Sequence, residues 1–219
     1  MKTVIYFWQI KRDFIPIAFI FMAINKLILK QNSEIKFIKL LGTGRGDTFT
    51  PKDANLLRWG LLVTIKEDSI ERLDLSKVIL WWRKIARSEY RALLNPISSH
   101  GKWSGQQPFI FEKNDWQGKV AAITRARIVW RKNFKFWAAV PPVTNSLRSS
   151  DGLIAAIGIG EAPIGLQGTF SIWENGARLK EFAYHGDAHR RAIKSTSEEN
   201  WYSEELFARF AVLNERGQL

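Results

Sequence analysis

Short runs of apolar residues alternate along the chain with polar and glycine-rich stretches, and their periods predict a mixture of strands and helices. In the first half, runs rich in β-branched and aromatic residues predict strands at 3–9, 35–41, 59–65 and 90–94. Longer apolar or amphipathic runs predict helices at 14–29 and 68–87. The second half repeats this order, with strands predicted at 120–128, 153–159, 167–173 and 205–212 and helices at 131–145 and 176–194.

The two halves also align with each other residue by residue. Val4 falls on Val120 at an offset of 116 positions, and the run 41–44 with its two glycines falls on 157–160. Further along, Gly60 falls on Gly168 at an offset of 108, which makes the second loop eight residues shorter. The sequence therefore carries an internal duplication.

A duplicated unit of strand, helix, strand, strand, helix and strand predicts an α+β fold made of two fused ferredoxin-like repeats. We expect one domain over residues 1–219, with repeats at about 1–97 and 118–215 and an excursion between them at 98–117. Such an architecture encloses a space between sheet and helices where a flat ligand can sit.

The run Gly42-Thr-Gly-Arg-Gly resembles part of a dinucleotide-binding fingerprint, which needs a helix N-terminus directly after the glycines. Here a further strand is predicted before the next helix, so the fingerprint does not apply. Because glycine permits the positive φ of tight turns, we predict a turn between strands at Gly42–Gly44 and a second one at Gly158–Gly160.

The apolar run at 14–29 resembles the start of a signal or membrane anchor. Pro16, Asn25 and Lys26 interrupt it, and what remains is shorter than the roughly 20 apolar residues that a bilayer span requires. We expect a buried or membrane-touching helix, in a cytoplasmic protein that is peripheral to the inner face of the cell membrane.

Composition removes several classes of site. The chain has no cysteine, which excludes disulfides, thiolate zinc sites, iron–sulfur clusters and thiolate-ligated haem. The net charge of +12 and the ten tryptophans suit either nucleic acid or an anionic lipid surface. No ribonucleoprotein-like or helix-turn-helix pattern is present, so we expect a membrane surface rather than nucleic acid as the partner.

The chain has three histidines, His100, His185 and His189. His185 and His189 are four positions apart, on one face of a predicted helix, and could chelate a metal. No glutamate or third ligand accompanies them, so two other interpretations stay open. The imidazoles could simply line the helix surface, or one could serve as the axial ligand of a haem iron.

Several runs resemble the spheroidene monooxygenase family, in matching order from about residue 35 to about residue 213. They are KLLGTGRGDTFTP and RWGLLVTI in the first repeat, GKWSGQQPF at 101–109, VAAITRARI at 120–128, IGIGEAPIGLQGTFSIW at 157–173 and HRRAIKSTSEENWYSEELFARF at 189–210. The resemblance implies a dimeric α+β barrel type of fold. It also implies O2-dependent oxidation of a linear carotenoid such as spheroidene at C2, by hydroxylation to a ketone, with haem and a ferredoxin-type electron donor.

The resemblance also implies roles for individual residues. His189 lies in the family's H-x-x-A-I run and is expected to be the axial haem ligand, while His185 matches no family position and stays a secondary candidate. Arg125 is expected to meet a haem propionate, because a guanidinium pairs bidentately with a carboxylate. The residues expected to line the substrate are Trp103, Ser104, Gln106, Gln167, Phe170 and Trp173.

Two alternatives to this monooxygenase remain open at the level of sequence. One is the same fold with other chemistry on haem or on another lipophilic substrate, because a fold does not fix a reaction. The other is a non-enzymatic protein that binds haem or a lipophilic ligand. Without cysteine the protein lacks the thiolate ligand of a P450, so oxygen activation would need another arrangement.

Overall fold

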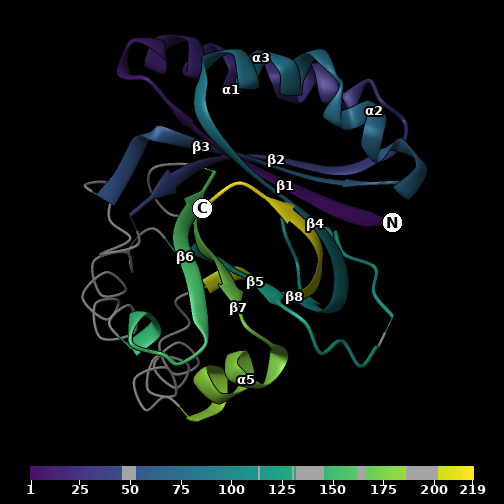
Figure 1. Cartoon of the computed structure of the whole chain (residues 1–219), viewed down its shortest axis with the longest axis vertical. Helices are drawn as coiled ribbons and strands as arrows, with labels where there is room; N and C mark the ends of the chain where they lie inside the picture. The colour runs from purple at the N-terminus through teal and green to yellow at the C-terminus, as the bar shows by residue number, and fades with distance from the viewer. Residues whose placement is uncertain (46–52, 113, 130, 132–145, 162–165, 186–201) are drawn as a thin grey trace.

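The computed structural model describes residues 1–45, 53–112, 114–129, 131, 146–161, 166–185 and 202–219 (Figure 1). The first half contains β1 (Lys2–Ile10), the short 3-10 helix η1 (Arg12–Phe14), α1 (Ile15–Lys30), β2 (Ile35–Gly44), β3 (Ala54–Ile65), η3 (Glu67–Ser69), α2 (Ile70–Asp74), α3 (Lys77–Ile85) and β4 (Ala86–Gly101). The second half contains β5 (Val120–Ile128), β6 (Leu153–Gly160), β7 (Leu166–Trp173), α5 (Gly176–His185) and β8 (Tyr202–Arg216).

The strands form one closed antiparallel barrel in the order β1-β3-β2-β6-β7-β5-β8-β4. Each half contributes four consecutive strands in equivalent order, β4-β1-β3-β2 from the first and β8-β5-β7-β6 from the second. This is the strand order of a duplicated ferredoxin-like unit, so the predicted fold class is confirmed. Residues 132–145 of the helix predicted at 131–145, and residues 186–194 of the one predicted at 176–194, lie outside the described residues.

The two halves join where β2 pairs with β6. Gly42 lies opposite Gly160, Thr43 opposite Ile159 and Gly44 opposite Gly158, a register that is symmetric about the central pair. The predicted turns at these glycines are therefore wrong, because the chain stays extended through both segments. β2 and β6 would otherwise be the open edges of the two half-sheets, and their pairing satisfies backbone groups that a turn would leave unpaired.

The strand register also corrects the alignment of the two repeats. Trp8 lies opposite Trp59 in the first half, and Thr124 lies opposite Thr169 in the second. Because Trp8 and Thr124 are 116 positions apart, Trp59 corresponds to Thr169 at an offset of 110. The alignment of Gly60 with Gly168, at an offset of 108, is therefore wrong by two residues. It matched two glycines by their identity, whereas the strand register shows which positions are equivalent.

Two element boundaries differ from the sequence expectations. The helix predicted at 68–87 is broken into η3, α2 and α3, because the Ser76 hydroxyl accepts a hydrogen bond from the Ile79 N–H and caps a new helix. The strand predicted at 90–94 extends through Pro96 to Gly101. Pro96 lacks an N–H but lies at a register shift between β4 and β8, where a ladder donor is not required.

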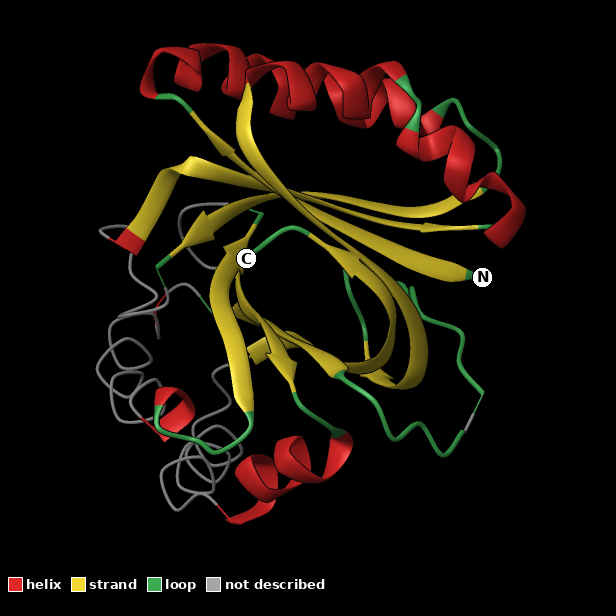
Figure 2. Ribbon diagram, in the orientation of Figure 1, coloured by secondary structure: helices red, strands yellow, loops and turns green. Residues whose placement is uncertain are grey.

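The first half buries an aromatic layer between its strands and its helices, which cover one side of the barrel (Figure 2). The rings of Trp8 and Trp82 stack with centroids 5.0 Å apart, and Tyr6 stacks on Trp8 at 5.3 Å. A second core fills the barrel interior and includes Phe7, Phe170 and Phe210. Among the described residues, none of the helices combines the length and the hydropathy needed to cross a bilayer.

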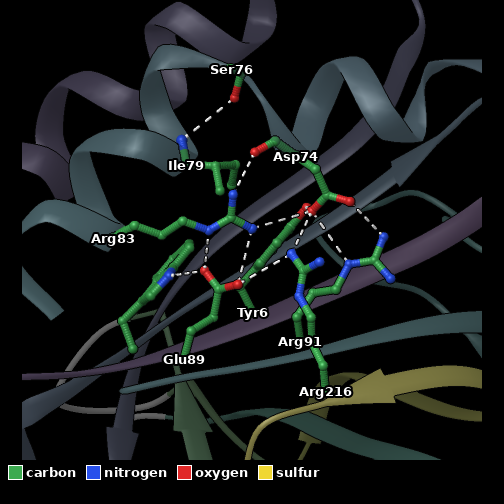
Figure 3. A network of polar contacts seen from close by, with 9 residues as sticks. Tyr6, Asp74, Ser76, Ile79, Arg83, Glu89, Arg91 and Arg216 are labelled. Atoms are coloured by element: carbon green, nitrogen blue, oxygen red, sulfur yellow. Dashed lines mark hydrogen bonds and ion pairs between the residues drawn. The ribbon is translucent and has the colours of Figure 1, made fainter. Parts of the chain in front are cut away.

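A network of charged side chains connects this helical layer to the sheet (Figure 3). Asp74, at the end of α2, accepts hydrogen bonds from the Tyr6 hydroxyl at 2.7 Å and from Arg91 Nη2 at 2.9 Å. Arg83 of α3 donates to the Asp74 carbonyl at 2.8 Å and to both carboxylate oxygens of Glu89 at 2.8 and 3.0 Å. Arg91 is buried, so its charge depends on Asp74 for compensation.

We expect Asp74→Ala to lower the free energy of unfolding by about 3 kcal/mol, because it leaves the buried Arg91 guanidinium and the Tyr6 hydroxyl without their carboxylate. Glu67→Ala is the matched control, since the Glu67 carboxylate is 63% exposed and lies 3.7 Å from Lys2. The control should change stability by less than about 0.5 kcal/mol. Urea unfolding curves of the two variants measure the difference, and equal losses would contradict a structural role for the network.

Candidate functional site

A cluster of charged residues lies inside the barrel near the end where β4 and β6 finish and β8 begins. Lys39 of β2 lies between Phe37 and Leu41, which both point into the barrel core, so strand alternation directs Lys39 inward as well. Arg125 of β5 and Glu204 of β8 are on the interior face for the same reason. Together with Trp103, Ser104 and Glu161, these three residues form what we call the interior charge cluster.

The two carboxylates connect the cluster. Glu161 accepts hydrogen bonds from the Lys39 ammonium and the Trp103 indole N–H, and lies 3.4 Å from Arg125 Nη2. Glu204 pairs with Arg125 and accepts from the backbone N–H groups of Ser104 at 2.9 Å and Gly105 at 2.6 Å. The charges of two cations and two carboxylates thus balance at this end of the barrel.

The segment after β4 forms a tight turn that this cluster holds in place. Ser104 and Gly105 have φ values of 55° and 75°, and Trp103 pairs with Gln106 across them. Such values are easy for glycine and uncommon for serine, so the hydrogen bonds to Glu204 help to keep Ser104 in this conformation. The turn inserts Trp103 into the barrel core, where it is 1% exposed and makes an edge contact with Phe37.

Burial and hydrogen bonding shift the proton affinities in the cluster. Burial lowers the pKa of Lys39, although its partner Glu161 acts in the opposite direction. Burial would raise the pKa of Glu204, but the N–H groups of Gly105 and Ser104 and the charge of Arg125 outweigh it, so this pKa lies below its ordinary value. Glu204 is therefore a carboxylate that the folded state keeps ionised.

The opposite face of the second half-sheet has a different character. Over the middle of β5, β6 and β7 the outward side chains are small, and neighbouring strands place them next to each other in two rows. One row contains Ala156, Ser171 and Ala122, and the other contains Gly158, Thr169 and Thr124. We call these six residues the small-residue face.

The equivalent positions in the first half carry large side chains. By the strand register, Ala122, Thr124, Ala156, Thr169 and Ser171 correspond to Tyr6, Trp8, Leu40, Trp59 and Leu61. The five first-half side chains are buried under α1 and α3. In the second half Thr124 is exposed and Thr169 is half-buried, whereas Ala122 is buried in a small cluster with Leu147, Trp173 and Leu179. The same fold thus fills the layer above one half-sheet with aromatic rings and lines the other with small side chains, which fill less of that layer.

The structure brings together three of the predicted site residues, Trp103, Ser104 and Arg125. Gln106 is exposed and contributes its backbone to the turn. The Arg125 guanidinium contacts Glu204 and Glu161, and its Nε has no hydrogen-bond partner among the described residues. The role of Arg125 toward a haem propionate stays a prediction. Its side chain is on the interior face of β5, across the sheet from the small-residue face.

The three residues predicted on β7 do not share a face. Phe170 points into the barrel core, where its ring lies 5.5 Å from that of Phe7. Trp173 lies on the outer face, stacks on Phe182 of α5 at 5.3 Å and donates its indole N–H to Ser171. The Gln167 backbone pairs with Ala126. Phe170 and Trp173 are three positions apart, and an odd spacing along a strand places two side chains on opposite faces.

Of the two histidines predicted as ligands, the structure describes only His185. His185 is the last residue of α5, and His189 lies outside the described residues. Within the described part of the chain, no group of three or more His, Asp or Glu residues is arranged to hold a metal ion. Sequence reasoning missed Lys39, Glu161, Glu204 and the small-residue face, although a register-corrected comparison of the two repeats would have found the last.

We expect Glu204→Gln to lower the free energy of unfolding at pH 7 by about 1–2 kcal/mol, because it weakens charge-assisted hydrogen bonds to the turn and to Arg125. Since folding lowers the pKa of Glu204, this contribution is complete above the unfolded value of about 4.3 and is lost as the pH falls through the folded value. The difference between wild type and variant should therefore narrow below about pH 4.

Urea unfolding at several pH values tests this dependence. Glu205→Gln, on the neighbouring residue but on the outer face of β8, should stay within about 0.5 kcal/mol of wild type at neutral pH. A difference for Glu204→Gln that does not change with pH would show that its carboxylate charge is not what holds the turn.

Comparisons with known proteins place the chain in a family. No protein-family model matches it. It is 36% identical to the spheroidene monooxygenase of Cereibacter sphaeroides over 90% of its own length, and it spans 62% of that relative. It is 35% identical to the spheroidene monooxygenase of Rhodobacter capsulatus over 90% of its length and 83% of that relative.

Among solved structures, an aldoxime dehydratase crystallised with butyraldoxime matches with a TM-score of 0.59 over 97% of this chain and 80% of that chain. At 12% identity this likeness concerns the fold alone. The two spheroidene relatives are much closer in sequence and are named as monooxygenases, that is, as oxygen-using oxidoreductases. On the identity and coverage that they show, the chain belongs to the spheroidene monooxygenase family.

Proposed function

We propose that this protein is an O2-dependent monooxygenase that oxidises a linear carotenoid of the spheroidene type, and that the small-residue face forms part of its binding site. Family membership supports the reaction and the substrate class. The observation that carries the location is the replacement of Tyr6, Trp8 and Trp59 by Ala122, Thr124 and Thr169 at equivalent positions of the duplicated fold. A hydrocarbon ligand offers no charge to bind, so apolar contact with a shaped surface must hold it.

Haem is the cofactor that we propose for this site, with His189 as its axial ligand. The row of Gly158, Thr169 and Thr124 would fit one side of a flat macrocycle, because its side chains are no larger than threonine across three strands and Thr124 is exposed. A bound haem would supply the capacity to activate O2. Because Arg125 is on the other face of β5 and already contacts two carboxylates, a haem on the small-residue face would need other partners for its propionates.

The overall reaction defines what the protein must provide. One turnover inserts one oxygen atom of O2 into a C–H bond, reduces the other to water, and consumes two electrons and two protons. The electrons must come from a separate donor, for which we propose a ferredoxin-type protein. A second hydroxylation at the same carbon, followed by loss of water, would give the ketone at C2.

The described residues contribute to this reaction by shaping the site. Thr124 and Thr169 are the accessible side chains of the small-residue face, and their methyl and hydroxyl groups would contact the ligand, while Ala122 and Ala156 pack beside them against Leu147, Trp173 and Leu179. Trp173 donates its indole N–H to Ser171 at 2.9 Å, which satisfies that polar group and leaves the indole ring packed on α5. The barrel interior, filled by its own core, serves as a rigid support.

The haem proposal is tested by the absorption spectrum of protein produced with added haem. We expect a Soret band that is retained in His185→Ala and lost in His189→Ala, because only the second variant removes the axial ligand. Loss in neither variant would reject His189 as the ligand. The absence of a band in wild-type protein would reject haem and leave the family's chemistry in need of another cofactor.

The location of the site is tested by transferring first-half residues into the second half. Thr124→Trp and Thr169→Trp install the side chains found at the equivalent positions Trp8 and Trp59, and should lower oxidation of spheroidene by roughly tenfold or more by occupying the ligand's space. Ala23→Leu, at an exposed position of α1, is the control and should leave turnover unchanged.

The assay supplies O2, a ferredoxin with its reductase, and solubilised spheroidene or lycopene, and identifies products by mass. Unchanged turnover in Thr124→Trp, in a variant whose circular dichroism spectrum matches that of the wild type, would contradict the proposed location. Ligand binding without any oxidised product in the wild type would favour a non-enzymatic binding protein.

A further inference from the structure

The outward face of α1 is apolar along its length. Phe19, Ile20 and Leu27 are 53%, 53% and 65% exposed, and Ile17 and Ile24 are 37% and 43% exposed. Ile17, Ile20, Ile24 and Leu27 follow each other at intervals of three or four residues, which places them on one stripe of the helix. A helix that covers a barrel in water normally presents polar side chains on this side.

The neighbouring helix continues the apolar surface. Leu80 and Trp81 of α3 are 46% and 37% exposed, and the Trp81 ring stacks on Phe21 of α1 with centroids 5.8 Å apart. The two helices lie side by side over the first half-sheet, on the side of the barrel away from α5 (Figure 1). We call the seven exposed residues the α1/α3 face; they are Ile17, Phe19, Ile20, Ile24, Leu27, Leu80 and Trp81.

The inward side of α1 buries a polar side chain. Asn25 is fully buried, and neither its amide nitrogen nor its amide oxygen has a hydrogen-bond partner among the described residues. Burying an unsatisfied amide costs roughly 1–3 kcal/mol, whereas Asn25 on the outer side would be solvated by water. A helix that buries its amide and exposes its large apolar residues is oriented for an outer medium less polar than water.

The charges on the two helices are of one sign. The ionisable residues of α1 are Lys26 and Lys30, and those of α3 are Lys77, Arg83 and Lys84, so neither helix carries an acidic residue. Lys26, Lys30, Lys77 and Lys84 are exposed, while Arg83 is engaged by Glu89. Lysines beside an apolar stripe are the pattern of helices that lie in the headgroup region of anionic membranes.

We propose that the α1/α3 face docks on an anionic lipid bilayer, with both helices in the plane of the interface. The sixteen residues of α1 suffice for an interfacial helix and are too few to cross the bilayer. A second copy of the chain fits this face less well, because a two-fold contact would bring the lysines of one copy toward those of the other. This surface is independent of the carotenoid chemistry, so docking and turnover can fail separately.

Vesicle cosedimentation tests the proposal with the full chain. Wild-type protein should bind vesicles of phosphatidylcholine with phosphatidylglycerol, should bind pure phosphatidylcholine vesicles more weakly, and should lose affinity as salt is raised. Ile20→Glu with Leu27→Glu should weaken binding by roughly tenfold or more, because two apolar contacts are replaced by charges that anionic lipid repels. Lys26→Glu with Lys30→Glu should reduce the preference for anionic vesicles.

The matched control is Ile110→Glu, which changes an isoleucine that is 76% exposed in the segment after β4. This variant should bind vesicles as the wild type does, and circular dichroism should show that all variants keep their fold. Equal vesicle binding by Ile20→Glu/Leu27→Glu and Ile110→Glu would overturn the proposal. If light scattering instead shows that the double variant dissociates an oligomer without changing vesicle binding, the face is a contact between copies of the chain.

Discussion

The pairing of edge strands is the constraint on which this structure depends. A four-stranded ferredoxin-like sheet has two open edges, and its backbone groups there must find partners. The duplicated chain solves this within one molecule, because β2 pairs with β6 and β4 pairs with β8. Once both seams are closed, the interior is a continuous apolar core, and each half-sheet presents its other face to its own helices. The two outer faces are then free to differ.

That freedom is visible in what each half does with its outer face. The outer face of the first half-sheet packs against helices, through stacked tryptophans and a charge network between helices and sheet. The second half carries alanine, serine, threonine and glycine at the equivalent positions. Under the proposals made above, the filled half rests on lipid and the small-residue half receives the ligand. A water-soluble electron donor can then approach the side of the barrel away from the membrane.

The sequence sufficed for the repeat, the order of the described elements and the fold class, since those depend on local apolar periods and on the alignment of the two halves. It failed at Gly42–Gly44, because pairing with a distant strand decides whether a glycine-rich segment turns or stays extended. It grouped Phe170 with Trp173 because a list of family runs carries no information on strand faces. It also missed Lys39, Glu161 and Glu204, whose contacts join segments up to 122 positions apart. Its main functional candidate, His189, stays a sequence prediction.

The unequal filling of the two halves has a consequence for how this protein can change over evolutionary time. The aromatic layer of the first half concentrates stabilising contacts in a region that we do not expect to touch the substrate, so it acts as a reserve of stability. Substitutions on the small-residue face can therefore lower the stability of the protein somewhat without unfolding the barrel. Related chains should therefore differ in the substrates they accept through changes in one repeat, while the other repeat tolerates little variation. Duplication lets one repeat stabilise the fold while the other changes its ligand contacts. A barrel assembled from two identical subunits cannot do this, because every substitution occurs in both halves.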